Sequence, residues 1–246
     1  MNHIVVVMSD FANDYYHGVM KGVICQSSEP VQFVDLPIHH PQSIINAGWI
    51  LLNSLPYFPE NSVFLIVVDP GVGTERAILS ARIGNKWIVV PDNGILSPLQ
   101  GKIDEIYRIP VASNSSHTFH GRDVFSPAVR AIVDGIHPSK LGLPIKAIYT
   151  ASDNIGPQEE SGIVVDIDSF GNIITNITTK PQKSELDISV NGKKYDIRLV
   201  DTFSDLEDQN LGVLLGSCNT LELVVNQGSA VQYFNEIKIG DPVILQ

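Results

Sequence analysis

The sequence predicts an α/β domain with a mainly parallel sheet, followed by a small β-rich domain. Over the first ~150 residues, short apolar runs alternate with segments of helical spacing, a pattern typical of β-α-β units. A polar stretch containing Gly and Pro follows at 150–162 and indicates a linker. Beyond it the segments are short and rich in β-forming residues. We therefore expect domains at 1–157 and 162–246.

The elements of the first domain follow from apolar patterning. Uniformly apolar runs predict strands covered on both faces of a sheet, at 4–8, 31–36, 63–68 and 87–90. Apolar residues at helical spacing predict three helices, at 14–26, 43–55 and 122–135. Gly135 provides the stop signal of the last helix.

The second domain is predicted to consist of short strands within 162–178, 186–200, 221–225 and 241–246. Asn191-Gly192, between alternating flanks, is a strong signal for a two-residue β-hairpin turn. Short antiparallel strands of this kind build either a barrel or a sandwich, and the pattern alone leaves both open.

Composition excludes several classes of protein. With 27 Asp and Glu against 16 Lys and Arg, the chain has a net charge of −11, which argues against a nucleic-acid partner. No apolar run approaches the ~18 residues that a membrane-spanning helix needs. Two cysteines, Cys25 and Cys218, cannot form a disulfide framework. We expect a cytoplasmic globular protein without nucleic-acid or membrane partners.

Four polar turns lie at or near the ends of the predicted strands, where parallel sheets bind ligands. They read "SDFAND", "DPGVGTER", "PDNG" and "FHGRD". Each motif taken alone is more often a structural turn, and "GVGTER" lacks the Lys-Ser/Thr ending of a phosphate-binding loop. His39 and His40 have no accompanying carboxylate or cysteine pattern, so no catalytic metal is predicted.

Taken together, the motifs carry more information. The blocks "SDF…GVMKG", "VDPGVGTER", "VVPDNGIL", "TFHGRDVFSPA", "DSFGNIITNI" and "LGS…LELVVNQGSA" cover nearly the whole chain. In order and approximate spacing the sequence resembles the S-adenosyl-L-methionine hydrolases that form adenosine, relatives of the fluorinase and chlorinase. This resemblance implies an amino-terminal α/β domain, a carboxyl-terminal β-barrel, and a homotrimer that holds its ligand between neighbouring subunits.

The resemblance also implies a catalytic set of Asp69, Arg76 and His120, which would position and activate a water molecule. The chemistry of these residues is suitable, because the sulfonium leaves as neutral methionine and needs no general acid, whereas water is a poor nucleophile. Arg76 is permanently cationic, Asp69 would hold its guanidinium, and His120 can take or relay a proton.

Substrate contacts are implied for seven further residues. Asp10 would grip the ribose diol, since a carboxylate accepts from two hydroxyls. Phe170 would stack on adenine, Asn172 would hydrogen-bond its edge, and Asn226 would line the adenine side. The methionine part would be held by Asp168 and Glu222 at its ammonium group and by Ser217 at its carboxylate.

Two positions depart from the fluorinase. Cys218 stands where the fluorinase has an Arg on the methionine carboxylate, and Gln42 stands where it has a Trp against the ribose.

The predicted reaction is hydrolysis of S-adenosyl-L-methionine to adenosine and L-methionine, without a cofactor and with adenosine as a candidate bound product. Alternatives remain: a nucleoside-binding module with vestigial catalysis, a halogenase, or a phosphate-ester hydrolase. The charged set is uncharged in the halogenases, and the chain shows no metal-binding carboxylate cluster of the kind expected of a phosphate-ester hydrolase.

Overall fold

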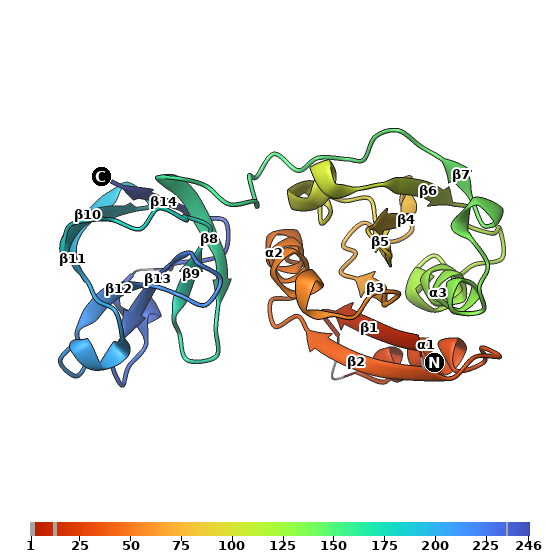
Figure 1. Cartoon of the computed structure of the whole chain (residues 1–246), viewed down its shortest axis with the longest axis horizontal. Coiled ribbons are helices and arrows are strands. Elements are labelled where there is room, and N and C mark those ends of the chain that lie inside the picture. Colours follow the sequence, from red (N-terminus) through yellow and green to blue (C-terminus); the bar gives the residue numbers. More distant parts are fainter. Residues whose placement is uncertain (1–2, 12–13, 235) are drawn as a thin grey trace. The chain divides into compact units, whose positions relative to one another are not determined.

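The computed structural model describes residues 3–11, 14–234 and 236–246. The chain divides into two compact units, Met1–Ala151 and Ser152–Gln246. We call them the α/β unit and the barrel unit. The predicted fold class is confirmed: the first unit is a sheet with helices, and the second is a closed barrel (Figure 1).

In its described residues the α/β unit has a seven-stranded sheet in the order β2-β1-β3-β5-β4-β6-β7. The four strands that the sequence predicted are mutually parallel: β1 (His3–Ser9), β2 (Val31–Pro37), β3 (Val63–Val67) and β5 (Lys86–Pro91). Three further strands are antiparallel to their neighbours: β4 (Ile78–Ile83), β6 (Glu105–Ile109) and β7 (Leu143–Pro144). Sequence patterning did not predict these three strands, and β4 matters for the site.

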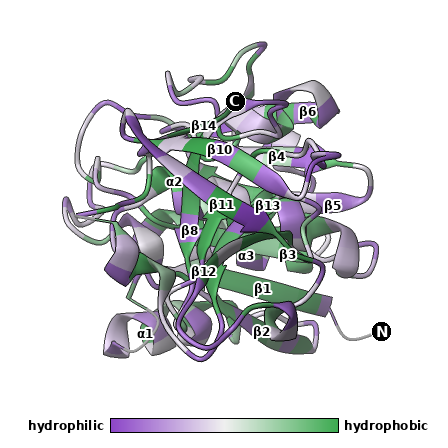
Figure 2. Cartoon of the chain, turned by 90° about the vertical axis from the view of Figure 1, so that its left-hand side faces the viewer, coloured by the Kyte–Doolittle hydropathy of each residue, from purple (hydrophilic) through white to green (hydrophobic). Residues whose placement is uncertain are grey.

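In the described part of the α/β unit, three α-helices cover the sheet and agree with the predicted segments. They are α1 (Tyr15–Ile24), α2 (Ile44–Ser54) and α3 (Ser126–Val133). Helices α1 and α3 pack with alternate residues of β1 and β3 in one core, and α2 packs with the remaining residues in another (Figure 1). Because both faces are covered, β1 and β3 are hydrophobic along their length, as Figure 2 shows.

Helix α3 does not begin as an ordinary helix. A π-helical turn, Gly121–Phe125, precedes it and includes the first part of the predicted helix at 122–135. Gly135 has φ +82°, a left-handed conformation that suits glycine after a helix end. Widened turns of this kind occur frequently at functional sites, and this one directly follows His120.

The barrel unit closes in the order β10-β11-β12-β13-β9-β8-β14. Its strands are β8 (Ser161–Ile167), β9 (Ile173–Thr175), β10 (Glu185–Val190), β11 (Lys193–Leu199), β12 (Leu211–Leu215), β13 (Leu221–Val225) and β14 (Pro242–Leu245). The predicted hairpin joins β10 and β11, and Asn191 and Gly192 both have positive φ, as its turn type requires. Neighbouring strands are antiparallel except β11 and β12, a parallel pair that the prediction of an antiparallel barrel did not include.

None of the helices in the described residues is both long and apolar enough to cross a membrane.

Candidate active site

The carboxyl edge of the parallel strands brings together residues that are far apart in the sequence. Asp10 follows β1 and Asp69 follows β3, and these strands are paired in parallel with Ser9 opposite Val67. Arg76 lies two residues before β4, which runs antiparallel to β5, so the beginning of β4 lies at the same edge. A buried strand and an antiparallel return strand thus deliver a carboxylate and a guanidinium to one turn.

Asp69, Arg76 and His120 form a buried hydrogen-bonded set, as their predicted joint role requires. Arg76 Nε donates to Asp69 Oδ1 over 2.8 Å, and Nη2 donates to the other carboxylate oxygen. The same Nη2 lies 3.0 Å from His120 Nδ1. The side chains of Arg76 and Asp69 are 8% and 5% exposed, and His120 is buried. Both hydrogen bonds from the Arg76 guanidinium to the Asp69 carboxylate are charge-assisted, and together they fix the orientation of the guanidinium.

The contact with Arg76 defines the protonation state of His120. A guanidinium only donates, so Nδ1 must accept and the neutral ring carries its hydrogen on Nε2. Burial lowers the pKa of His120 below 6.5, and the positive charge of Arg76 lowers it further, with Asp69 acting in the opposite direction. The imidazole is therefore neutral near pH 7, with Nε2–H as a hydrogen-bond donor.

Two glycines permit this arrangement. Gly73 has φ +80°, and a Cβ there would lie 2.5 Å from the carbonyl oxygen of His117. A Cβ on Gly121 would lie 2.7 Å from Met20 Sδ. The turn that carries Arg76 and the turn that follows His120 therefore both pack closer than any other residue would allow.

Asp10, Asp69 and His120 line one cavity of about 160 Å³, together with Phe11, Gln42 and Phe119 among others. Asp10 Oδ2 accepts the backbone N–H of Gln42 over 2.8 Å, which orients the carboxylate. Arg76 contacts Asp69 and His120 from outside this lining and faces two other hollows, of about 780 and 630 Å³. Its Nη1 is buried without a hydrogen-bond partner.

In the barrel unit, the turn between β8 and β9 holds three of the predicted residues. Asp168 Oδ1 accepts the backbone N–H groups of Phe170 and Asn172, each over 2.9 Å, and Oδ2 accepts Asn172 Nδ2 over 2.9 Å. Asp168 thus shapes the turn, and Asn172 keeps one amide hydrogen and its carbonyl for a ligand. Phe170 is 76% exposed, an unusual position for a large aromatic ring.

The remaining predicted residues lie near the hairpin of β12 and β13. Ser217 is exposed in the connecting turn, and Glu222 lies on β13. Burial raises the pKa of Glu222, and the carboxylates of Asp168 and Asp166 raise it further. A Cβ on Gly216 would lie 1.7 Å from Glu222 Oε1, so this glycine makes room for the carboxylate.

The side chains of Asn226 and Cys218 also belong to the barrel unit. Asn226 Nδ2 donates to the carbonyl of Leu206 and to Asp208, each over 3.0 Å, so this side chain ties down the loop before β12. Burial raises the pKa of the Cys218 thiol, which is consequently neutral near pH 7.

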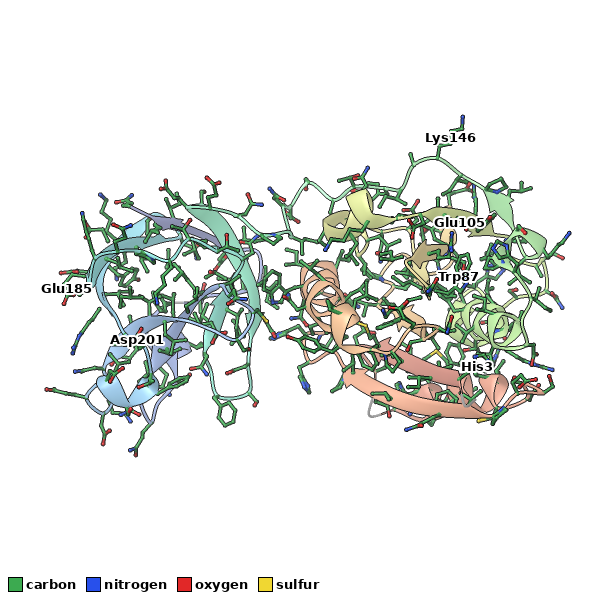
Figure 3. The ribbon with its side chains drawn as sticks, in the orientation of Figure 1. His3, Trp87, Glu105, Lys146, Glu185 and Asp201 are labelled. Atoms are coloured by element: carbon green, nitrogen blue, oxygen red, sulfur yellow. The ribbon has the colours of Figure 1, made fainter. Side chains whose placement is uncertain are left out.

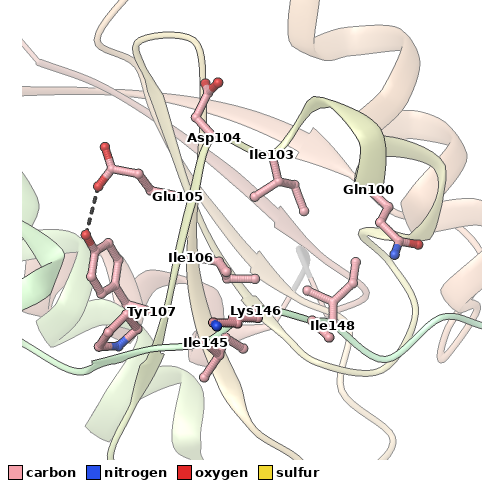
Figure 4. Close-up of a pocket in the computed structure, with 11 residues that line it drawn as sticks. Gln100, Ile103, Asp104, Glu105, Ile106, Tyr107, Ile145, Lys146 and Ile148 are labelled. Carbon is pink, nitrogen blue, oxygen red and sulfur yellow. Dashed lines mark hydrogen bonds between the residues drawn. The ribbon is translucent and has the colours of Figure 1, made fainter.

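One other hollow shares none of these residues. A pocket of about 330 Å³ beside β6 contains none of the predicted site residues (Figure 4). Its Tyr107 donates to Glu105 over 2.8 Å, and Lys146 on its rim extends away from the ribbon (Figure 3). Among the described side chains, no group of three or more His, Cys, Asp or Glu could hold a metal ion.

Sequence reasoning missed a second polar cluster, formed by Ser9, His17, Lys21 and Asp35. His17 lies on the buried face of α1, where its position gives no signal of function. It also missed the Gln42 N–H contact to Asp10, which is a backbone interaction and has no side-chain signature.

The fold and site define an α/β protein with an appended β-barrel and a buried carboxylate–guanidinium–imidazole set at the ligand-binding edge of its sheet. The chain belongs to the SAM hydroxide adenosyltransferase family. The family's N-terminal domain matches residues 5–142, and its C-terminal domain matches residues 162–244.

Individual relatives are similar over about nine-tenths of the chain or close to all of it. The chain is 34% identical, over 98% of both proteins, to an "(R)-S-adenosyl-L-methionine hydrolase" of Thermus thermophilus. A protein of the same name from Salinispora tropica is 27% identical over 89% of this chain and 90% of its own length. A solved structure from Thermotoga maritima, described as an uncharacterized conserved protein, has a TM-score of 0.88 at 28% identity, covering 98% of this chain and all of its own.

Proposed function

We propose that the protein hydrolyses S-adenosyl-L-methionine to adenosine and L-methionine. The observation that carries the proposal is the hydrogen-bonded set of Asp69, Arg76 and a neutral His120, next to a cavity shared with Asp10. The names of the relatives from Thermus thermophilus and Salinispora tropica support the same reaction.

The reaction is a displacement at the ribose C5′ carbon. An oxygen–C5′ bond forms, the C5′–sulfur bond breaks, and its electron pair remains on sulfur, which leaves as a neutral thioether. One water is consumed and one proton is released. The leaving group needs no acid, so the work of the protein is to supply an oxygen nucleophile, because bulk water has a pKa of ~15.7.

Arg76 and His120 favour hydroxide character in that nucleophile. Nε2–H of His120 is the ring donor left for a ligand, and it would donate to the oxygen while a lone pair points at C5′. Arg76 places a fixed positive charge behind the ring. His120 Nδ1 already accepts a hydrogen bond from Arg76, and Nε2 already carries a hydrogen. The proton released from water therefore passes to solvent unless the hydrogen bond between Arg76 and His120 opens.

The other predicted residues bind the substrate in this proposal. Asp10, oriented by the Gln42 N–H, accepts from the ribose hydroxyls. Phe170 provides an exposed ring for adenine, and Asn172 retains one donor and one acceptor for its edge. Asn226 lines the adenine side through its carbonyl oxygen, the part of the amide that its structural bonds leave available.

At the methionine end, Glu222 is the stronger candidate for the ammonium group, because Asp168 already accepts three hydrogen bonds within its turn. Ser217 is exposed and available for the carboxylate.

The alternatives fit the structure less well. A halogenase needs a neutral, dry pocket for its halide, whereas this chain buries a charged set at the site. A vestigial binding module has no need to retain a carboxylate and an imidazole that are both hydrogen-bonded to one guanidinium. We propose that no cofactor takes part, since the substrate carries its own leaving group.

We also propose a homotrimer whose active sites combine the α/β unit of one subunit with the barrel unit of a neighbour. Each unit carries only part of the predicted contact set, and rotationally repeated contacts of this kind close into rings. Light scattering should give about three times the chain mass of 26.9 kDa. At subsaturating substrate, mixtures of Asp10→Ala and Asn172→Ala subunits should recover part of the activity that each variant loses; no recovery after proven subunit exchange would contradict this assembly.

Both cysteines are free thiols, and Cys25 is exposed. Free exposed thiols suit a reducing compartment, so we propose that the reaction takes place in the cytoplasm.

The reaction is tested by incubation with S-adenosyl-L-methionine in halide-free H₂¹⁸O, followed by chromatography and mass spectrometry. We expect equal amounts of adenosine and methionine, with the label in the adenosine 5′-hydroxyl. Label in methionine, or tight adenosine binding without turnover, would contradict the proposal. For a substitution of Arg76 in the same assay, the matched control is Arg108→Ala, which changes an arginine on β6 outside the set.

A further inference from the structure

A second chain of polar groups lies beneath Asp10. Ser9, the last residue of β1, is fully buried, and its Oγ lies 2.9 Å from Nδ1 of His17, which is 6% exposed. His17 Nε2 lies 2.8 Å from Asp35 Oδ1 on β2. Lys21, one helical turn beyond His17, donates to the other oxygen of Asp35 over 2.6 Å. This series of hydrogen-bonded side chains thus links β1, α1 and β2.

The hydrogens of this chain can be assigned. Nε2 of His17 faces a carboxylate and therefore carries a hydrogen that it donates. In the neutral ring Nδ1 then accepts from the Ser9 hydroxyl, so both ring nitrogens are satisfied. The order of Ser, His and Asp resembles that of a nucleophilic triad, but Ser9 is fully buried and cannot reach a substrate. The hydrogen bonds of Ser9 can instead affect the position of the next residue in the sequence.

That neighbour is Asp10. The carbonyl of Ser9 accepts the N–H of Ile38 over 3.3 Å, and the Asp10 carboxylate accepts the N–H of Gln42 over 2.8 Å. Both donors belong to the segment that follows β2, the strand that carries Asp35. The position of the Asp10 carboxylate therefore depends on how Ser9 and β2 are held together, and His17 is the side chain that bonds to both.

We infer that His17 is a positioning residue that orients Asp10 for the ribose diol, acting through Ser9 and Asp35. The inference rests on the proposed function, because it takes Asp10 as the nucleoside-binding carboxylate. His17 touches no reacting atom, so its effect is on binding and not on the chemical step.

The test is His17→Phe, which keeps a ring in the core and removes both hydrogen bonds. We expect the adenosine Kd, measured by calorimetry, to rise about tenfold, as for the loss of a well-placed hydrogen bond. Turnover at saturating S-adenosyl-L-methionine should change less than about twofold, since binding alone is affected. Asp35→Asn, which weakens the same chain from its exposed end, should raise the Kd in the same direction by a smaller factor.

Asp134→Asn is the matched control. Asp134 accepts from Ser27 and from the backbone of Ser28 over 2.7 and 2.9 Å, a similar polar link just beyond the other end of α1. It should lower the melting temperature without changing the adenosine Kd. If the role of His17 were merely structural, His17→Phe would likewise lower the melting temperature and leave the adenosine Kd unchanged.

A double-mutant cycle separates the two roles. In an Asp10→Ala background, His17→Phe should leave the residual adenosine affinity unchanged. The inference is overturned if His17→Phe binds adenosine as the wild type does, or if the same fold-loss appears in both backgrounds. If His17→Phe fails to fold, Asp35→Asn takes its place in the cycle. A wild type that binds no adenosine would instead refute the proposed function.

Discussion

The α/β unit and the barrel unit differ in the charged groups that surround their predicted site carboxylates. The α/β unit has twelve acidic and ten basic residues, and its central carboxylate, Asp69, is neutralised by Arg76. The barrel unit has fifteen acidic and six basic residues, and the charges that act on its half-buried Glu222 are the carboxylates of Asp168 and Asp166. In one unit a guanidinium pairs with the central carboxylate, and in the other the neighbouring carboxylates raise the pKa of Glu222.

The contrast suggests a division of labour. A compensated, rigid set is suited to preparing a nucleophile, because its dipoles need no rearrangement during the reaction. A group of neighbouring carboxylates is suited to a cationic ligand, and S-adenosyl-L-methionine carries a sulfonium and an ammonium group. Substitutions in the α/β set should therefore lower turnover, whereas substitutions in the barrel should lower affinity.

The largest effect is expected for Arg76→Ala. It removes the charge behind His120 and leaves Asp69 as an unpaired buried carboxylate, which should destabilise the protein by about 3–5 kcal/mol. Turnover should fall by roughly 10³-fold, the scale for loss of a preorganised electrostatic group. Single-turnover chemistry and thermal unfolding measure the two effects. Near wild-type turnover would remove Arg76 from the mechanism.

His120→Gln should come next, with turnover lower by about 10²-fold, because an amide supplies a donor in a different position. Adenosine affinity should stay within a factor of about two, since binding and catalysis are separate in this account. Calorimetry alongside steady-state kinetics tests the separation. Equal losses of affinity and turnover would contradict it.

The regions that could be predicted from the sequence are those in which one signal dominates. Strands β1, β3 and β5 are largely buried and almost uniformly apolar, so they were recognisable, whereas β2 was predicted correctly as a strand although it lies at the sheet edge and none of its residues is buried. Strand β4 contains the fully buried Ser80 and the ion-paired Arg82, which interrupt that pattern, and it was missed. The set of Asp69, Arg76 and His120 was accessible through family motifs, but the tautomer of His120 follows only from its distance to Arg76.

Asp10→Asn should weaken adenosine binding by about tenfold, because one acceptor for the ribose diol becomes a donor. Its effect on turnover at saturation should be small. Titration calorimetry provides the measurement, with Asp104→Asn, at an exposed position between the short 3-10 helix Ser97–Lys102 and β6, as control. Undiminished affinity would remove Asp10 from the ribose site.

Glu222→Gln should have the smallest effect, a few-fold rise in the KM for S-adenosyl-L-methionine, the scale for loss of one partly exposed charge contact. Adenosine affinity should be unchanged, since adenosine lacks the ammonium group. Because the pKa of Glu222 is raised above 4.5, substrate affinity should improve as pH rises through that raised value. An equal loss for adenosine would place Glu222 elsewhere.

In the resting enzyme, Arg76 holds His120 neutral, with its hydrogen on Nε2. ¹⁵N NMR of histidine-labelled protein, assigned with His120→Gln, reads this directly. We expect Nδ1 unprotonated and Nε2 protonated at pH 7, titrating below 6.5 because burial and Arg76 lower the pKa. The activity should fall in the same acid range, and so should the stability, since the unfolded chain binds the proton first. An imidazolium at pH 7, or a neutral ring with its hydrogen on Nδ1, would contradict the account.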